Sequence, residues 1–137
     1  MTSGVQVAQR GRQIDREACL TALAAGEIAR VVYHQAALPA VEVVVYDLVD
    51  DGIVFSVPDG SGLAGVEEGS VLALTVDTVD GEGSGLCVLV TGKVRELAEA
   101  RGAGNGADRP TPDGSPRTLV IPLQRLSGHR VALALRR

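Results

Sequence analysis

Aromatic side chains are scarce in this sequence of 137 residues: Tyr33, Tyr46 and Phe55 are the only ones, and tryptophan is absent. Proteins that bind single-stranded nucleic acids need aromatic faces on which bases stack, set beside a basic groove. The formal net charge of −4 also disfavours attraction to nucleic acids and to anionic membranes. We therefore expect neither a nucleic acid nor a membrane among the partners of this protein.

Cysteine and histidine are limited to two residues each, namely Cys19 and Cys87, and His34 and His129. The cysteines lie in apolar patterns, so we interpret them as small buried residues and not as a disulfide framework. Neither residue type has the spacing of zinc ligands, which predicts no metal site. The sequence has no basic-then-apolar signal segment and no apolar run of about 18 residues, and we expect a cytoplasmic protein.

Valine, leucine, isoleucine and alanine supply most of the 45% hydrophobic content, and β-branched residues suit strands. The length fits one domain. We predict a flexible N-terminal arm at 1–14, followed by a single domain at 15–137. Within that domain, residues 98–116 are rich in Gly, Pro, Asp and Ala, which predicts a mobile insertion.

The apolar pattern predicts six strands and two short helices. Asp15 is expected to cap a helix at 15–25, with Gly26 as a left-handed residue just past its end. A second helix of two turns is expected at 61–68. The strands are expected at 27–35, 41–49, 53–57, 71–79, 86–97 and 119–135, the last with a bend at Ser127 and Gly128.

The strand at 41–49 is apolar on both faces, because Val43 and Val45 alternate with Val44 and Tyr46. A sheet with one face in water would instead alternate between apolar and polar residues. Both faces are therefore expected to be covered. In a domain of this size the second cover is most simply another copy of the chain, and we predict a twofold homodimer.

Four segments in a fixed order carry a family resemblance. The strand Val41–Val49 is followed by DDGIVFSVPDGSGL at 50–63, by SVLALTVD at 70–77 and by GLCVLVTGKVREL at 85–97. This order and spacing resemble the pyridoxamine 5′-phosphate oxidase-like family of FMN-binding split β-barrels, over residues 15–97 and more loosely over 117–131. The resemblance implies a mainly β fold with short helices, built as a six-stranded antiparallel split β-barrel. It also implies a homodimer that binds FMN or another small molecule at its interface and acts as a flavin-dependent oxidoreductase.

The same resemblance locates the phosphate end of the FMN site. Relatives commonly hold the phosphate with a basic residue and a hydroxyl at the end of the third strand, and with a Gly-Ser-Lys that opens the next helix. Here Ser56 stands in place of the basic residue, Val57 in place of the hydroxyl and Gly62 in place of the lysine, while Ser61 and the helix amides remain. With Asp59 close by and no cation in this segment, we predict a weakened phosphate site.

The resemblance places the flavin ring beside two further pairs of residues. Val45 precedes Tyr46 where relatives often have an asparagine, and Leu86 precedes Cys87 where relatives often have Trp-Ser. No catalytic residue is assigned, because the flavin performs the hydride chemistry in such enzymes. The cofactor-binding residues implied in this way are Val45, Tyr46, Ser56, Val57, Ser61, Gly62, Leu63, Leu86 and Cys87.

Two other functions fit the same residues. One is a non-catalytic split-barrel dimer that has lost flavin binding and holds either nothing or an uncharged ligand. The other is a barrel for a different cofactor, such as a deazaflavin or a haem, whose axial ligand could only be His34 or His129. Arg125 and Arg130, which flank the last bend, are interpreted as solvated charges, with contact to an anion from a partner subunit as the alternative.

Overall fold

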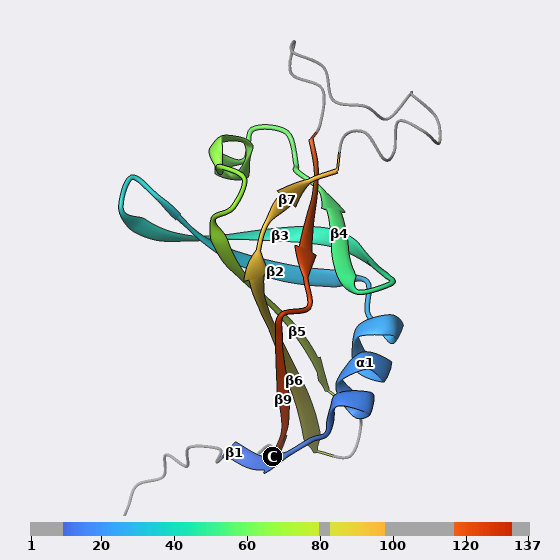
Figure 1. Cartoon of the computed structure of the whole chain (residues 1–137). Coiled ribbons are helices and arrows are strands. Elements are labelled where there is room, and N and C mark those ends of the chain that lie inside the picture. The colour runs from blue at the N-terminus through green and yellow to red at the C-terminus, as the bar shows by residue number, and fades with distance from the viewer. Residues whose placement is uncertain (1–9, 80–82, 98–116, 133–137) are drawn as a thin grey trace, which may run out of the picture.

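The chain folds into one curled antiparallel sheet with the strand order β1-β9-β6-β5-β2-β3-β4-β8-β7 (Figure 1). The computed structural model describes residues 10–79, 83–97 and 117–132. One α-helix, α1 (Arg16–Ala25), and one 3-10 helix, η1 (Gly62–Gly65), lie among the described residues. The strands in these residues are β1 (Arg10–Gln13), β2 (Ile28–Gln35), β3 (Leu38–Val49), β4 (Gly52–Ser56), β5 (Val71–Val79), β6 (Ser84–Lys93), β7 (Arg95–Glu96), β8 (Thr118–Pro122) and β9 (Arg125–Ala132).

The mainly β, antiparallel architecture agrees with the prediction, whereas the described residues form nine strands and not six. The predicted strand 86–97 is divided into β6 and β7, and the predicted last strand into β8 and β9. The additional strand β1 lies in the segment expected as a flexible arm, where it pairs with the open edge of β9. Residues 1–9 of that arm and the expected insertion at 98–116 lie outside the described residues.

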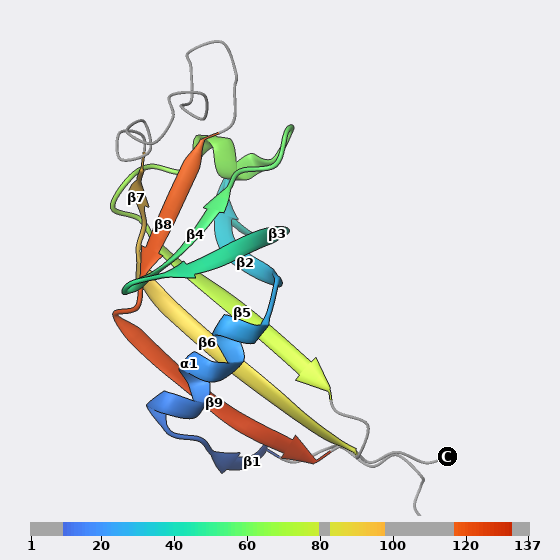
Figure 2. The same ribbon diagram turned by 90° about the vertical axis from the view of Figure 1, so that its right-hand side faces the viewer.

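The last two strands join opposite ends of the sheet. In the strand order β9 is second and β8 is eighth, yet only Leu123 and Gln124 separate them in the sequence. The sheet must therefore curl until these strands can follow one another (Figure 2). Two hydrogen bonds fix this corner: Leu123 N–H donates to Asp51 O at 2.9 Å, and Gln124 N–H donates to Pro122 O at 2.8 Å.

Helix α1 packs against one side of the sheet, across β9, β6 and β5 (Figure 2). Asp15 caps it as predicted, because its Oδ1 accepts the Ala18 N–H at 2.8 Å. Cys19, Ala22 and Leu23 are the buried residues of the helix. We call this side of the sheet the inner face and the opposite side the outer face.

Gly26 ends α1 as predicted, but not in the predicted left-handed conformation. Its φ is −85°, and its N–H donates to Ala22 O and Leu23 O at 3.2 Å each. Glycine is needed here for space, because a Cβ would lie 2.5 Å from Tyr46 Oη and 3.2 Å from Val76 Cγ1. The Tyr46 hydroxyl occupies this place because it donates to Leu23 O at 2.6 Å, which ties α1 to β3.

Aliphatic side chains fill the core on the inner face, and the only aromatic rings among them are those of Tyr33, Tyr46 and Phe55. Cys19 belongs to this core with 1% of its surface exposed, as predicted. Close packing of many small side chains replaces the few large rings of a typical core. The largest side chains that are wholly buried are Leu23, Ile53, Leu63, Leu74, Leu119 and Ile121.

The two-turn helix expected at 61–68 is reduced to the single 3-10 turn of η1. Gly62 and Gly65 lie within this turn, and glycine is a poor helix former. Beyond it the chain turns again at Gly69, whose φ of +94° is a conformation that other residues rarely adopt. The segment between β4 and β5 is therefore a series of tight turns.

Candidate functional site

The residues expected at the FMN phosphate do not form one anion-binding surface. Ser56 is exposed at the end of β4, whereas Val57 lies in the core with 5% of its surface exposed. The Val57 N–H is also in use, since it donates to Arg117 O at 2.9 Å. Ser61 is buried, and its Oγ accepts the Leu63 N–H at 2.9 Å as the N-cap of η1.

Two N–H groups near the start of η1 and one at its C-cap are taken up within the turn itself. Leu63 N–H donates to Ser61 Oγ, Ala64 N–H donates to Ser61 O at 3.1 Å, and Val66 N–H donates to Leu63 O at 3.1 Å. A helix N-terminus attracts an anion through N–H groups that have no other partner. The amides of Leu63 and Ala64 are therefore not available to a phosphate, although the sequence led us to expect free helix amides here.

Gly62, at the position of the expected lysine, is covered by a side chain from the end of β2. A Cβ on Gly62 would lie 2.6 Å from Nε2 of Gln35. Gln35 is exposed, so its carboxamide covers the glycine without being locked there. Between Ser56 and Gly62 the chain thus offers one exposed hydroxyl, the carboxylate of Asp59 and no cation.

The cation nearest to η1 is Arg117, which sequence reasoning did not single out. Its Nη1 donates to the carbonyl oxygens of Ala64, Val66 and Leu63 at 2.8, 3.1 and 3.3 Å. Its Nε and Nη2 donate to the two carboxylate oxygens of Glu96, each at 3.2 Å. Arg117 therefore holds η1 through carbonyl oxygens, and its Nε, Nη1 and Nη2 are all engaged in these bonds and in the bonds to Glu96. An arginine directly after a Pro-rich insertion carries no motif by which this role could be recognised.

In each of the two pairs expected at the flavin ring, Val45–Tyr46 and Leu86–Cys87, one residue faces the core and the other lies on the outer face. Tyr46 has 4% of its surface exposed and lies in the core, and Leu86 packs partly buried against that core. Val45, with 72% of its surface exposed, and Cys87 lie on the outer face. Leu63, the remaining candidate, is wholly buried. The structure therefore brings only Val45 and Cys87 to one surface, on β3 and β6, with β2 and β5 between them.

Cys87 lies between two polar residues in a row across the outer face. The register pairs it with Asp77 on β5 and with His129 on β9. Burial raises the pKa of the Cys87 thiol, and a hydrogen bond to the Asp77 carboxylate and the negative charge of that carboxylate raise it further. Asp77 in turn meets Nη1 of Arg30 at 3.4 Å. Cys87 therefore stays a thiol at neutral pH, which does not suit a nucleophile or a metal ligand.

The outer face is otherwise a broad apolar surface over β3, β2, β5 and β6. Cross-strand pairs place Val45 beside Ile28, and Val41 beside Val32, on adjacent strands. Exposed apolar surfaces of this extent on soluble proteins usually mark a site of interaction. The exposed fractions are 59% for Ile28, 58% for Val41, 53% for Val43, 72% for Val45, 60% for Val71 and 39% for Leu89.

In the described part of the chain, no three His, Cys, Asp or Glu side chains lie close enough together to bind a metal ion. His34 lies at the exposed end of β2, and His129 lies on β9. None of the helices in the same residues is both long enough and apolar enough to cross a membrane.

Solved structures share this fold at low sequence identity. The FAD-binding protein from Mycobacterium smegmatis is 16% identical, with a TM-score of 0.71 over 90% of this chain and 99% of that one. The FAD-binding protein from Mesorhizobium loti is 15% identical, with a TM-score of 0.70 over 88% and 96%. The FAD- and haem-binding protein from M. smegmatis is 16% identical, with a TM-score of 0.69 over 87% and 73%.

No curated protein sequence matches this chain. The sequence model of the pyridoxamine 5′-phosphate oxidase family, in contrast, matches residues 15–130, which include α1 and every strand of the curled sheet except β1 and the last residues of β9. The likeness to the solved structures agrees with this match, since it spans most of the same chain. The chain therefore belongs to the pyridoxamine 5′-phosphate oxidase family.

Proposed function

We propose that this chain is a cytoplasmic flavin-binding protein that holds the flavin ring against the outer face, between the two copies of a homodimer. The observation that carries the proposal is the exposed apolar outer face with Val45 and Cys87, which the family resemblance associates with the ring. The relatives named as FAD-binding proteins have the same fold. A bound flavin would supply hydride transfer, while the residues of the chain bind and orient it.

The homodimer is supported by the same surface. Val41, Val43 and Val45 each leave more than half of their surface exposed in a single chain. Burial of apolar surface yields roughly 25 cal/mol per Å², so a second copy would stabilise these strands. An obligate interface of this kind buries on the order of 2,000 Å² or more.

The proposed flavin site holds the phosphate of FMN weakly at Ser56 and Gly62. Two cations expected there are absent, Val57 is buried and Ser61 already accepts a hydrogen bond. Charge-assisted hydrogen bonds are worth about 1.5–3 kcal/mol each. Without two of them, binding weakens by about 3–6 kcal/mol, or roughly a hundred- to ten-thousandfold.

The visible absorption spectrum of the purified protein, followed by titration with FMN and FAD, tests this proposal. The two visible bands of oxidised flavin, in the isolated protein or after addition of flavin, support it. A colourless protein that binds neither flavin refutes it and leaves a non-catalytic dimer. A submicromolar dissociation constant for FMN would refute the weak phosphate end.

A matched pair of variants tests the phosphate end separately. Ser56 is exposed, so Ser56→Arg adds the missing cation without entering the core and should tighten FMN binding by about tenfold. Thr21→Arg adds the same charge on the exposed side of α1 and should leave FMN binding unchanged. Equal effects of the two variants would show that net charge, and not position, sets the affinity.

A further inference from the structure

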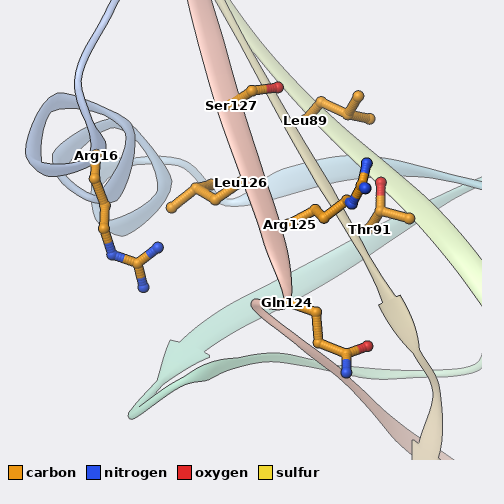
Figure 3. A pocket seen from close by; sticks show the side chains of 7 residues that line it. All are labelled: Arg16, Leu89, Thr91, Gln124, Arg125, Leu126 and Ser127. Carbon is orange, nitrogen blue, oxygen red and sulfur yellow. The ribbon is translucent and has the colours of Figure 1, made fainter.

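A groove runs around β9 at the corner where the chain turns from β8 into β9 (Figure 3). Its volume is about 490 Å³, which lies within the range of small-molecule sites. Its lining includes Arg16 from α1 and Arg125 from β9, and it contains no carboxylate. In a chain with 17 acidic and 13 basic residues, such a surface is locally cationic and favours an anion.

Neither arginine is engaged elsewhere in the described part of the chain. The ion pairs found there join Arg30 to Asp77 and Arg117 to Glu96. Arg16 and Arg125 are both exposed and have no carboxylate partner among these residues. Their guanidinium groups are therefore free to make the paired hydrogen bonds by which arginine holds phosphate.

Neutral hydrogen-bond donors line the same groove as the two arginines. Oε1 of Gln124 accepts the backbone N–H of Lys93 at 2.9 Å, which turns the amide so that its NH2 group remains to donate. The hydroxyls of Thr91 and Ser127 also line the groove.

The backbone of Leu126 adds one further donor. Gly128 O accepts from Ile14 N–H, so Gly128 directs its backbone groups away from β6, toward β1. Residues two apart in a strand direct these groups to the same edge. The Leu126 N–H therefore faces the same open edge, beyond the reach of the β1 pairing at His129 and Val131.

The two guanidinium groups lie on opposite sides of β9. Figure 3 shows Arg16 on the side of α1 and Arg125 on the side of Thr91, with Gln124 at the corner between them. Because the two arginines line the groove from opposite sides of β9, a ligand with two linked phosphate groups suits the pair better than a single tetrahedral oxyanion does. We propose that this groove binds the diphosphate group of a nucleotide-like ligand through Arg16, Arg125 and Gln124.

This inference goes beyond the proposed flavin site, because the groove is separate from Ser56 and Gly62. It rests on the proposed function only for the source of the diphosphate. FAD contains a diphosphate and FMN does not, so a flavin dinucleotide could supply it, and so could a separate nucleoside diphosphate. Arg125 and Thr91 lie on the outer face, which places half of the groove beside the second copy of the proposed homodimer.

Calorimetric titration of the full chain with inorganic pyrophosphate tests the groove without any flavin. We expect saturable binding that is tighter than binding of orthophosphate and that weakens as salt is added. Arg16→Gln and Arg125→Gln should each weaken pyrophosphate binding by about tenfold. Arg130→Gln removes the same charge from an exposed position on β9 outside the groove and should leave binding within about twofold.

Absence of saturable pyrophosphate binding would overturn the inference. So would an equal loss in all three variants, which indicates an adventitious ion only. Because the substituted residues are exposed, unchanged melting temperatures should show that the variants remain folded.

Titration with FAD, FMN and ADP then identifies the source of the diphosphate. Tighter binding of FAD than of FMN, with the difference lost in Arg125→Gln, supports a flavin dinucleotide. Binding of pyrophosphate and ADP without either flavin supports the groove and refutes the proposed flavin function. A third outcome is that FMN and FAD bind equally well, that Arg125→Gln changes neither affinity, and that pyrophosphate does not bind. This outcome supports the flavin function and refutes the groove.

Discussion

Replacement of Arg117 by methionine should destabilise the protein markedly, because the guanidinium group of Arg117 holds η1. Methionine keeps much of the apolar stem but removes every donor. Three carbonyl oxygens of η1 and the Glu96 carboxylate lose their partner. The Arg117 and Glu96 side chains are 19% and 32% exposed, so the lower end of the range for charged hydrogen bonds applies. We expect a loss of about 2–4 kcal/mol in the free energy of unfolding.

Thermal unfolding followed by circular dichroism measures this loss. A chain of 137 residues has an unfolding entropy of roughly 0.29 kcal/mol per kelvin, so the melting temperature should fall by about 7–14 °C. The control Arg95→Met removes an exposed arginine from β7 and should cost less than about 0.5 kcal/mol. Glu96→Gln keeps the carbonyl contacts of Arg117 and should cost about 1 kcal/mol.

Two results would refute this reasoning. Equal melting temperatures for Arg117→Met and Arg95→Met would mean that Arg117 does not hold η1 in solution. A cost for Glu96→Gln as large as that for Arg117→Met would mean that the ion pair, and not the contact with the carbonyl groups, carries the stabilisation.

Four further outcomes are expected. Val43→Glu on the outer face should convert the proposed dimer to a monomer in sedimentation velocity, whereas Ala24→Glu on the exposed side of α1 should not; a dimer in both cases would contradict this interface. Gly26→Ala and Tyr46→Phe should each cost about 1–3 kcal/mol in urea unfolding, but their combination should cost less than the sum, because loss of the hydroxyl makes room for the Cβ; additive costs would rule out the clash. Asp77→Asn removes the negative charge that helps to raise the pKa of Cys87 and replaces a carboxylate acceptor with a weaker amide oxygen, so this thiol should react faster with iodoacetamide at about pH 8, with Cys19 as the internal control. The pKa values of Cys19, Cys87 and Tyr46 are all raised, so the folded state binds these protons more tightly, and the free energy of unfolding should fall as the pH rises through the ordinary thiol pKa of 9.0.

Elements with a strong local signal could be predicted from the sequence. The cap at Asp15 and the helical spacing of Ala18, Cys19, Ala22 and Leu23 predict α1. The structure confirms the cap and buries all of these apolar residues except Ala18, which is half-buried. The long apolar runs at 41–49 and 71–79 likewise predict β3 and β5, because their pattern depends on the chain itself. The sequence also places valine on both faces of β3, and in a single chain the outer one of these faces is exposed.

The candidate site depended on contacts that no local pattern encodes. Val57 is directed into the core because β4 pairs with β8, a strand that follows some sixty residues later. The Ser61 hydroxyl is occupied because it caps η1 by accepting the Leu63 N–H. The roles of Gln35 and Arg117 arise where distant segments meet. A resemblance between two sequences matches residue types at equivalent positions, but it does not show where their side chains and backbone groups point.

The two-residue corner at Leu123 and Gln124 has a consequence for synthesis of the chain on the ribosome. Until residues 117–132 have emerged, β4 and β6 each lack the partner that β8 or β9 provides. The nascent sheet then has two open edges, with unpaired backbone groups that invite association with other chains. The sheet can close only after the last strands have emerged. β8 then pairs with β4 and β9 pairs with β6 in one step, because the corner between β8 and β9 is too short for one strand to dock without the other. A nascent chain that stalls before residue 117 is therefore a sheet with two edges that can pair with other chains. In the finished chain, β8 and β9 cover both of these edges at the same time.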